Sequence, residues 1–302
     1  MALRIRLLGT AAGGGLPQWN CACGNCRAAR AGRIVQRTQS SVAVSADGVN
    51  WFLINASPDL RSQIEAASAL QPQGTSARHS PIAGVLLTNA DLDHVLGLIL
   101  LREGQLLPIL ATDAVRETLT GPLGFEVLLG GFCGVRWEPA PREFSALRGR
   151  DGAPSGLSVR ALFLPGGPPR FAKDAQEREG HSVAFQIRDE KDARLLLAPD
   201  VAEITPELQQ ALEEADAVIF DGTFWSTDEL RRIHPQARLA HEMGHLPIRD
   251  GSLRVLGGIP ARWKIFTHIN NTNPILAPDS PERAAVIEAG IVVGEDGMEF
   301  EL

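Results

Sequence analysis

The feature that most constrains this chain is an apolar strand that runs directly into a group of potential metal ligands. Residues Ile82 to Thr88 are apolar enough for a buried strand, and Asn89-Ala-Asp-Leu-Asp-His94 follows without a break. A strand of this kind holds the side chains at its end on a rigid edge, and a tight loop there would let Asp91, Asp93 and His94 converge on one or two ions. We therefore predict a metal site at the end of this strand.

A simpler alternative is that the same residues begin a helix. Asp is a common N-cap residue, and either Asp91 or Asp93 could cap a helix over Val95 to Leu101. The two interpretations differ in whether the carboxylates bind backbone N–H groups or a cation. Taken alone, this segment leaves both open.

Strand-like runs come in hairpin pairs early in the chain and alternate with helices later. The predicted strands are Leu3 to Leu8, Ser41 to Ser45, Trp51 to Asn55, Val159 to Leu164, Ser182 to Ile187, Leu195 to Ala198, Ala217 to Phe220 and Lys264 to Phe266. Asp47-Gly48 is a hairpin turn signal between the second and third of them. Helices are predicted over Asp59 to Leu70, Pro206 to Glu214 and Pro281 to Ala289. This order predicts an α/β fold in which helices cover sheets.

No repeat or low-complexity segment divides the chain, so residues 1–302 are expected to form a single domain. The polar, Gly- and Pro-rich stretch Pro139 to Gly156 is expected to be a surface loop. The similar stretch Gly166 to Gly180 is expected to shape the rim of a pocket.

Three of the four cysteines fall within six positions, in Cys21-Ala-Cys-Gly-Asn-Cys26. Their spacing would let the three thiols hold one tetrahedral zinc ion, which then needs a fourth ligand from elsewhere. Such crowding suits a metal better than a disulfide framework. Three reduced surface thiols, or a redox role for Cys23 and Cys26, are the alternatives.

The charge balance argues against nucleic acid as a partner, because 29 Lys and Arg against 36 Asp and Glu give a formal charge of −7. No window approaches the roughly 18 uninterrupted apolar residues of a membrane span, and the N-terminal apolar run is too short for a signal peptide. We expect a soluble, cytoplasmic protein that binds neither nucleic acid nor membranes.

The segment after the first buried strand is similar to the H-x-H-x-D-H motif of the metallo-β-lactamase superfamily. Asp93 and His94 match the last two positions of that motif, whereas Asn89 and Asp91 stand in place of its first two histidines. The resemblance implies an αββα sandwich of two mixed sheets flanked by helices.

Two later segments extend the resemblance. Leu195-Leu-Leu-Ala-Pro-Asp200 is similar to the strand that delivers the family's bridging aspartate, and Phe266-Thr-His268 to the strand that delivers its last metal histidine. The family's middle histidine usually follows a strand such as Val159 to Leu164, but Pro165-Gly166-Gly167 stands there instead. That ligand is therefore expected to be absent.

These departures change the metal that the site is expected to prefer. The resemblance implies that the active-site metal is held by five residues, Asp91, Asp93, His94, Asp200 and His268. Replacing imidazoles by a carboxylate and an amide makes the donor set harder, which suits Fe²⁺ better than Zn²⁺ or Mn²⁺ and favours one ion over a pair.

The thiol-rich segment resembles the structural zinc site of PhnP-like phosphodiesterases in the same superfamily. The fourth ligand of that site, a histidine, would fall on Asn271, which is a poor zinc ligand. The resemblance thus implies a structural Zn²⁺ on Cys21, Cys23 and Cys26, with its fourth donor open.

Several further residues are candidates for catalysis and substrate binding. In the tRNase Z and PhnP branch, a histidine serves as general acid or base, and His245 matches that position best; Asp93 is the second catalytic candidate. A zinc-protease helix over His241 to His245 is disfavoured by Gly244 and Pro247. Asn89, Asn270 and Asn271 are expected to bind substrate through their amides, although the Asn-rich loop could instead satisfy its own backbone.

The combined motifs resemble the branch of the superfamily that serves synthesis of pyrroloquinoline quinone (PQQ). They are Ala11-Ala-Gly-Gly-Gly-Leu-Pro-Gln-Trp-Asn-Cys-Ala-Cys23, Phe220-Asp-Gly-Thr-Phe-Trp225, Met243-Gly-His-Leu-Pro247 and His268-Ile-Asn-Asn-Thr-Asn-Pro274. The resemblance implies Fe²⁺- and O₂-dependent hydroxylation of the tyrosine part of a Glu–Tyr-derived precursor. The expected partners are that small peptide-derived precursor or PQQ, and other proteins of the pathway.

Two alternatives remain. A carrier of PQQ or its precursor, on a degenerate hydrolase scaffold, is favoured by Asn89 and the missing histidine near Pro165. A phosphodiesterase or β-lactamase-like hydrolase is least favoured, because the histidines for a dinuclear zinc centre are incomplete.

Overall fold

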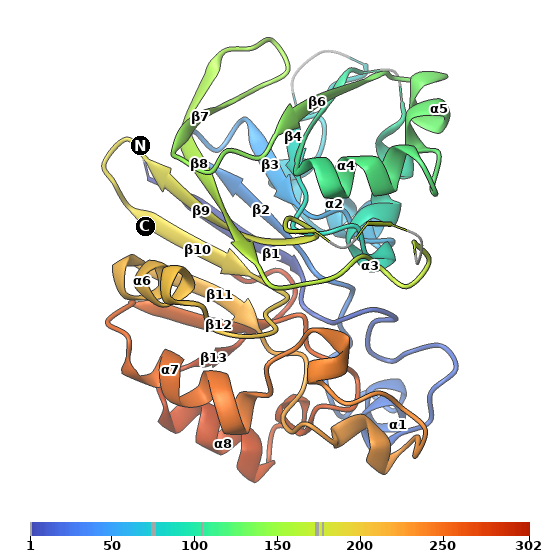
Figure 1. Cartoon of the computed structure of the whole chain (residues 1–302), viewed down its shortest axis with the longest axis vertical. Helices are drawn as coiled ribbons and strands as arrows, with labels where there is room; N and C mark the ends of the chain where they lie inside the picture. The colour runs from blue at the N-terminus through green and yellow to red at the C-terminus, as the bar shows by residue number, and fades with distance from the viewer. Residues whose placement is uncertain (1, 74–76, 104, 173–174, 177) are drawn as a thin grey trace.

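Two sheets of seven strands form the centre of the protein, as seen in a computed structural model (Figure 1). The structure describes residues 2–73, 77–103, 105–172, 175–176 and 178–302. Within these residues, the first sheet has the strand order β14-β1-β2-β3-β4-β5-β6. Its strands are β1 (Arg4–Gly9), β2 (Ser41–Ser45), β3 (Trp51–Ile54), β4 (Ile82–Leu86), β5 (Leu107–Ala111), β6 (Val135–Pro139) and β14 (Glu299–Glu301).

The second sheet is formed by later segments, in the order β13-β12-β11-β10-β9-β8-β7. Its strands are β7 (Ser145–Arg148), β8 (Pro154–Leu164), β9 (Ser182–Asp189), β10 (Arg194–Ala198), β11 (Ala217–Asp221), β12 (Trp263–Thr267) and β13 (Val292–Val293). Both sheets mix parallel and antiparallel pairs.

Helices cover the outer face of each sheet, so the layers run helix, sheet, sheet, helix (Figure 1). The first sheet carries α2 (Leu60–Glu65), α3 (Leu92–Val95), α4 (Asp113–Thr120) and α5 (Phe125–Gly130), and the second carries α6 (Pro206–Glu214), α7 (Leu253–Gly258) and α8 (Pro281–Glu288). A third apolar cluster fills the space between the sheets. The predicted αββα sandwich is confirmed.

Local chemistry accounts for the helices that were predicted. Thr205 and Ser280 cap α6 and α8 through their hydroxyl oxygens, and Pro206 and Pro281 occupy the first turns. The predicted helix over Asp59 to Leu70 is interrupted, because α2 ends at Glu65 and a 3₁₀ turn follows from Ser68 to Leu70.

One prediction about the loops was wrong. The stretch Pro139 to Gly156 contains β7 and the start of β8, which pair antiparallel from Ser145 opposite Val159 to Arg148 opposite Pro154. Strand β7 is the edge strand, and only Leu147 among its residues is buried. An edge strand with so little apolar surface lacks the alternation that marks strands in a sequence.

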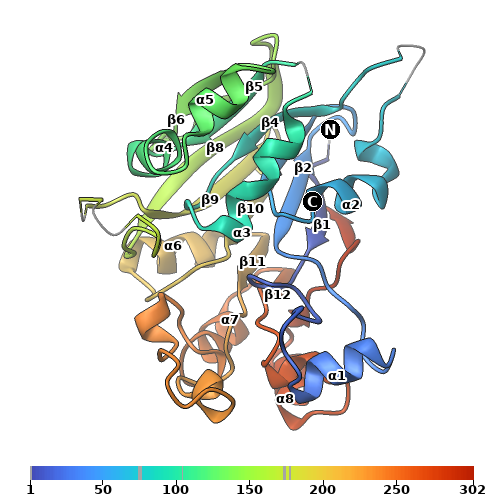
Figure 2. The same cartoon turned by 90° about the vertical axis from the view of Figure 1, so that its right-hand side faces the viewer.

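The parallel strands β10, β11 and β12 bring their carboxyl ends to one edge of the second sheet. Strand β4 is likewise parallel to β3 and β5 in the first sheet. Figure 2 gives a second view of the strands, and α1 (Gly24–Arg30) lies at the same end of the molecule as α7 and α8 in both views. No helix among the described residues is long and apolar enough to cross a membrane.

Candidate metal centre

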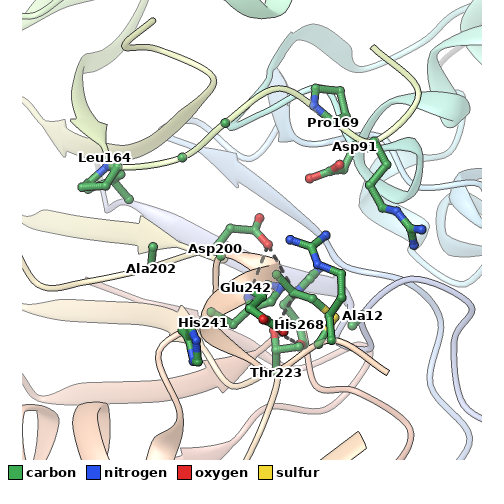
Figure 3. A pocket seen from close by; sticks show the side chains of 18 of the residues that line it. Ala12, Asp91, Leu164, Pro169, Asp200, Ala202, Thr223, His241, Glu242 and His268 are labelled. Atoms are coloured by element: carbon green, nitrogen blue, oxygen red, sulfur yellow. Dashed lines mark hydrogen bonds and ion pairs between the residues drawn. The ribbon is translucent and has the colours of Figure 1, made fainter. Parts of the chain in front are cut away.

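A cavity of about 1160 Å³ opens where the strand ends of the two sheets meet. Asp91 and Asp93 reach it from the segment after β4, Asp200 from the segment after β10, and His268 from the residue after β12. Figure 3 shows Asp91 on one wall, with Asp200 and His268 across the cavity from it. Residues far apart in the chain therefore meet around one space, as the sequence predicted.

Two overlapping groups of side chains could each hold a metal ion. In the first, ligand atoms of Asp93, His94 and His268 lie within 4.8 Å of one another, and in the second those of Asp200, His245 and His268 do. His268 Nε2 lies 3.1 Å from Asp93 Oδ2, and His94 Nε2 lies 3.9 Å from the same oxygen. Because His268 belongs to both groups, the two form one continuous centre.

The Nδ1 atoms of His94, His245 and His268 each form a hydrogen bond with an acceptor in the protein. His94 Nδ1 donates to Asn89 Oδ1 at 2.8 Å, an oxygen that also accepts from a backbone N–H. His245 Nδ1 donates to the Asp221 carboxylate at 2.8 Å. These acceptors carry no proton to give, so the proton must sit on Nδ1.

His268 follows the same rule through a hydroxyl. Thr223 Oγ1 donates to Asp221 Oδ1 at 2.6 Å, which leaves its lone pairs to accept from His268 Nδ1 at 2.8 Å. In all three imidazoles Nε2 is therefore the nitrogen left to bind a cation, an arrangement typical of metal-ligating histidines, and in His268 this atom contacts Asp93 Oδ2 at 3.1 Å. His94 Nε2 is buried and has no hydrogen-bond partner, a state that a bound ion would relieve.

The charges at the centre are strongly coupled. Burial works against the imidazolium of His268, but Asp200, Asp93 and Asp221 outweigh it and raise the pKa of His268 to about 10. Burial alone would raise the pKa of Asp93, yet His94 and His268 hold it well below its usual range. The proton that His268 retains therefore balances the carboxylates until a cation replaces it.

Asp91 differs from the other predicted ligands. It occupies the N-cap position of α3, but its side chain makes no capping hydrogen bond. The helix-cap alternative therefore accounts for the position of Asp91 in the chain and does not account for its carboxylate. Burial, together with the charges of Asp93 and Asp200, raises the pKa of Asp91 to about 6. It lines the cavity and lies outside both compact ligand groups.

The asparagines expected to bind substrate have different positions. Asn270 lines the cavity, whereas Asn89 and Asn271 do not. Asn89 is buried, with Nδ2 donating to Asp200 Oδ2 at 3.0 Å and Oδ1 bound to His94. Its amide thus orients two metal-ligand candidates, and it lies outside the cavity wall where a substrate-binding amide was expected. Asn89 lies three residues after the end of β4, where its side chain is buried.

The segment predicted to lack the middle histidine also lines the cavity. Pro165, Gly166 and Gly167 form part of its wall, so this wall offers no imidazole. The expected rim role of Gly166 to Gly180 is confirmed for residues such as Arg170 and Arg178, although residues 173–174 and 177 lie outside the described residues.

The three clustered cysteines form a second potential metal site. Ligand atoms of Cys21, Cys23 and Cys26 lie within 4.8 Å of one another, and all three are free thiols. Cys23 is the N-cap of α1 and accepts from Cys26 N. Burial raises the pKa of Cys23 to about 11, while backbone and side-chain hydrogen bonds overcome burial to lower that of Cys21.

Asn271 faces these thiols and not the cavity. Its Nδ2 lies 3.2 Å from Cys21 Sγ, 3.6 Å from Cys23 Sγ and 3.2 Å from Cys26 Sγ. The amide therefore occupies the position from which a fourth donor would approach a cation held by the three sulfurs. Asn271 was expected to bind substrate, but the structure places its buried side chain against the sulfur atoms and outside the cavity wall.

Asp221 and Thr223 are functional candidates that the sequence did not reveal. Asp221 is the last residue of β11, and it is fully buried while it accepts from His245 and Thr223. The motif Phe220-Asp-Gly-Thr was visible as a resemblance, but only the fold shows that it orients two histidines. A polar residue directly after a buried strand was the available signal.

Known proteins are similar to the chain over its whole length. A family described as Beta-lactamase superfamily domain matches residues 50–269. Proteins named coenzyme PQQ synthesis protein B from Cupriavidus taiwanensis and Rhizobium meliloti are each 42% identical to this chain. The alignments cover 99% of this chain and 99% and 98% of those relatives.

Solved structures agree with these matches. The crystal structure of Zn²⁺-bound PqqB from Methylobacterium extorquens is 39% identical, with a TM-score of 0.89 over 99% of this chain and 100% of that one. A diphosphatase from the PhnP family has a TM-score of 0.71 at 19% identity, covering 100% and 98% of the two chains, which shows a shared fold alone.

Proposed function

We propose that this chain hydroxylates the tyrosine part of a Glu–Tyr-derived PQQ precursor. The chain belongs to the beta-lactamase superfamily and, within it, to the coenzyme PQQ synthesis protein B family. A role in PQQ biosynthesis follows from the family itself. The hydroxylation, its metal and its substrate are the proposal, as are a cytoplasmic location and contact with other proteins of the pathway.

The donor set fits a single iron(II) ion. Asp93, His94 and His268 offer one carboxylate and two imidazoles, with Asp200 on the far side of His268. One or two histidines with carboxylates and open positions suit Fe²⁺, whereas zinc favours more N and S donors. The Methylobacterium relative held zinc in its crystal, so Zn²⁺ and Mn²⁺ remain the alternatives to test. When bound, iron(II) would supply the activation of O₂.

His245 is the proposed acid–base residue. It lines the cavity, and its Nδ1 is held by Asp221, which leaves Nε2 to accept a phenolic proton. Burial disfavours the imidazolium, but Asp221 and Asp200 raise the pKa of His245 above its usual value. Asp221 is therefore a positioning residue that keeps His245 in the tautomer needed for proton transfer.

The mouth of the cavity favours a ligand that carries carboxylates. Arg178 is paired with Glu117 at 2.6 Å, and Glu179 is paired with Arg142. Arg170 and Arg238 line the same cavity, and neither makes an ion pair with a described residue. Arg238 interacts with the nearby charge of Glu242, and both guanidinium groups would attract the carboxylates of a Glu–Tyr-derived molecule.

The observation that carries the proposal is the orientation of the three imidazoles, with His94 Nε2 buried and unpartnered beside Asp93. It is tested by anaerobic reconstitution with Fe²⁺, followed by O₂ consumption with a tyrosine-containing substrate and ascorbate as reductant. Protein loaded with Zn²⁺ or Mn²⁺ is the control. Turnover with Fe²⁺ alone supports the proposal, and its absence with every metal despite tight PQQ binding contradicts it.

A carrier function is the second candidate, favoured by the wall at Pro165 to Gly167, which lacks a ligand. In that case Asp93→Ala and His268→Ala would weaken PQQ binding, and no chemical step would be lost.

For the cysteine site we propose a structural Zn²⁺ held by the three sulfurs. Half a turn of the Asn271 amide would present Oδ1 as the fourth donor.

A further inference from the structure

A single six-residue segment connects the two potential metal sites. It begins with His268 at the metal centre, passes Asn270 in the cavity wall, and reaches Asn271 on the three thiols before it ends at Asn273. Only two residues separate the active-site imidazole from the amide that touches sulfur. The backbone between His268 and Asn271 is therefore a short covalent path by which a displacement at one site can reach the other.

His268 has a backbone conformation that needs support from its surroundings. Its φ of +54° lies in the left-handed region, which costs a residue with a side chain of order 1 kcal/mol or more. On one side the support comes from the end of β1, where Ile269 N donates to Thr10 O at 2.9 Å and Ala12 N donates to Ile269 O at 3.0 Å. These bonds fix the segment beside the cavity.

On the other side the support comes from the cysteine-bearing loop. Asn25 Nδ2 donates to both Asn271 O and Asn273 O, at 3.0 and 2.9 Å. Cys23 Sγ donates to Asn271 O at 3.6 Å, and the Asn271 amide contacts the three sulfurs at 3.2 to 3.6 Å. Contacts to protonated thiols are weak, whereas a cation bound by the same sulfurs would fix the loop rigidly.

The same loop also touches the metal centre directly. Ala12 and Gly13, a few residues before Cys21, line the cavity. A Cβ at Gly13 would lie 3.3 Å from Asp93 Oδ2, so the backbone there closes one side of this ligand. The segment that leads to the cysteines thus borders the centre directly through Gly13, while Asn271 of the shared segment contacts the thiols.

We propose that the two sites are coupled, so that zinc on the cysteines strengthens metal binding at the centre, with Asn271 as the positioning residue that transmits the effect to His268. This inference rests on the proposed metal centre. Coupling between sites is typically about 5- to 150-fold in affinity, and it is reciprocal by linkage. We expect a value near the middle of that range, because one ligand of the centre, His268, lies on the shared segment.

The test uses Co²⁺, whose visible absorption reports binding at the centre, and protein with one zinc per chain. Zinc on the cysteines is verified by their protection from a thiol reagent. We expect the Co²⁺ dissociation constant to rise about tenfold or more in Cys21→Ser/Cys26→Ser, which cannot hold a metal on the thiols, and in Asn271→Ala. Asn271→Asp, which keeps an oxygen donor, should largely restore the affinity. Cys133→Ser is the matched control, because that thiol lies outside the cluster.

The reverse direction uses the unmodified protein, so it does not depend on how a variant folds. Zinc release from the cysteines to a chromogenic chelator should slow several-fold once Co²⁺ fills the centre. Equal release rates, or equal Co²⁺ affinities with and without zinc, would overturn the coupling while leaving the metal centre intact. If the wild-type chain binds no metal beyond one zinc, the proposed centre fails, and the coupling fails with it.

Discussion

The cysteine cluster draws its ligands from six consecutive residues, whereas the metal centre draws its ligands from segments that lie more than a hundred residues apart. In the first, a short loop sets the geometry, and Cys21 and Cys23 are partly exposed to solvent. In the second, strand ends of two sheets set the geometry, and His94 is completely buried. The contrast teaches that a local site can bind its ion early and stabilise a loop, while the distributed site exists only after the sandwich has formed.

The sharpest test of this contrast removes a ligand from the distributed site. Asp93→Ala should abolish metal binding at the centre and lower activity by more than about 1,000-fold, since losing a ligand costs more than the 10–100-fold typical of the groups that orient ligands. Metal analysis should still find one zinc per chain on the cysteines. Loss of both metals would show that the two regions do not differ in the way described.

Removing a ligand from the local site should act mainly on stability. Cys26→Ser should eliminate the zinc and lower the free energy of unfolding by about 4 kcal/mol at zinc concentrations near 1,000 times its Kd. Denaturant unfolding with and without a chelator measures the loss, and the chelator should have no further effect on the variant. An unchanged unfolding curve would argue that the thiols hold no structural ion.

A buried carboxyl group beside the segment that joins the two regions should make the stability of the protein depend on pH. Glu229 accepts from Thr272 Oγ1 at 2.5 Å, and burial raises its pKa to about 7 from 4.5. The folded state then holds this proton where the unfolded state has lost it, so stability falls as the pH rises from about 4.5 to 7. The difference approaches about 3 kcal/mol.

Glu229→Gln should abolish that dependence, and unfolding midpoints of the two proteins across this pH range measure it. Other groups titrate in both proteins, so the quantity of interest is the difference between the two curves. Parallel curves would mean that Glu229 ionises normally.

A smaller effect should follow from disturbing the orientation of a ligand and leaving the ligand itself in place. Asn89→Leu removes the acceptor for His94 Nδ1 and the donor to Asp200, so metal affinity at the centre should fall about 10- to 100-fold. Asn89→Asp retains an acceptor for His94 and should lose less. Titration with Co²⁺ distinguishes the two, and equal affinities would assign Asn89 a role in packing alone.

The smallest effects are expected at the mouth of the cavity. Arg170→Gln and Arg238→Gln should each weaken PQQ binding about 5- to 10-fold, as expected for a partly exposed charged hydrogen bond. Arg249→Gln is the control, because Arg249 pairs with Asp250 and does not line the cavity. Isothermal titration measures the affinities, and similar values for all three variants would exclude carboxylate recognition by these two arginines.

The sequence predicted the fold and the meeting of distant residues well, for a physical reason. Buried strands such as β4 and β10 are continuous apolar runs, and the polar residues that follow them must lie at a sheet edge. The edge strand β7 was missed because only Leu147 faces the core.

Side-chain direction was beyond the reach of sequence patterns. Asn89, Asn270 and Asn271 are chemically alike, yet one orients ligands, one lines the cavity and one faces the thiols. The role of each amide depends on the direction in which the backbone conformation of its segment points the side chain. Asp221 and Thr223 were missed for the same reason, since their role exists only through contacts with His245 and His268.

The wall at Pro165 to Gly167 offers protein engineers a way to add a ligand to this scaffold. A Cβ at Gly166 would lie 2.8 Å from the Ser182 Cβ, but a Cβ at Gly167 would meet no atom within 4 Å. Gly167→His would thus introduce an imidazole into open space at the edge of the cavity. A designer could use that single replacement to ask how many nitrogen donors convert an oxygen-rich centre into one that retains a pair of zinc ions.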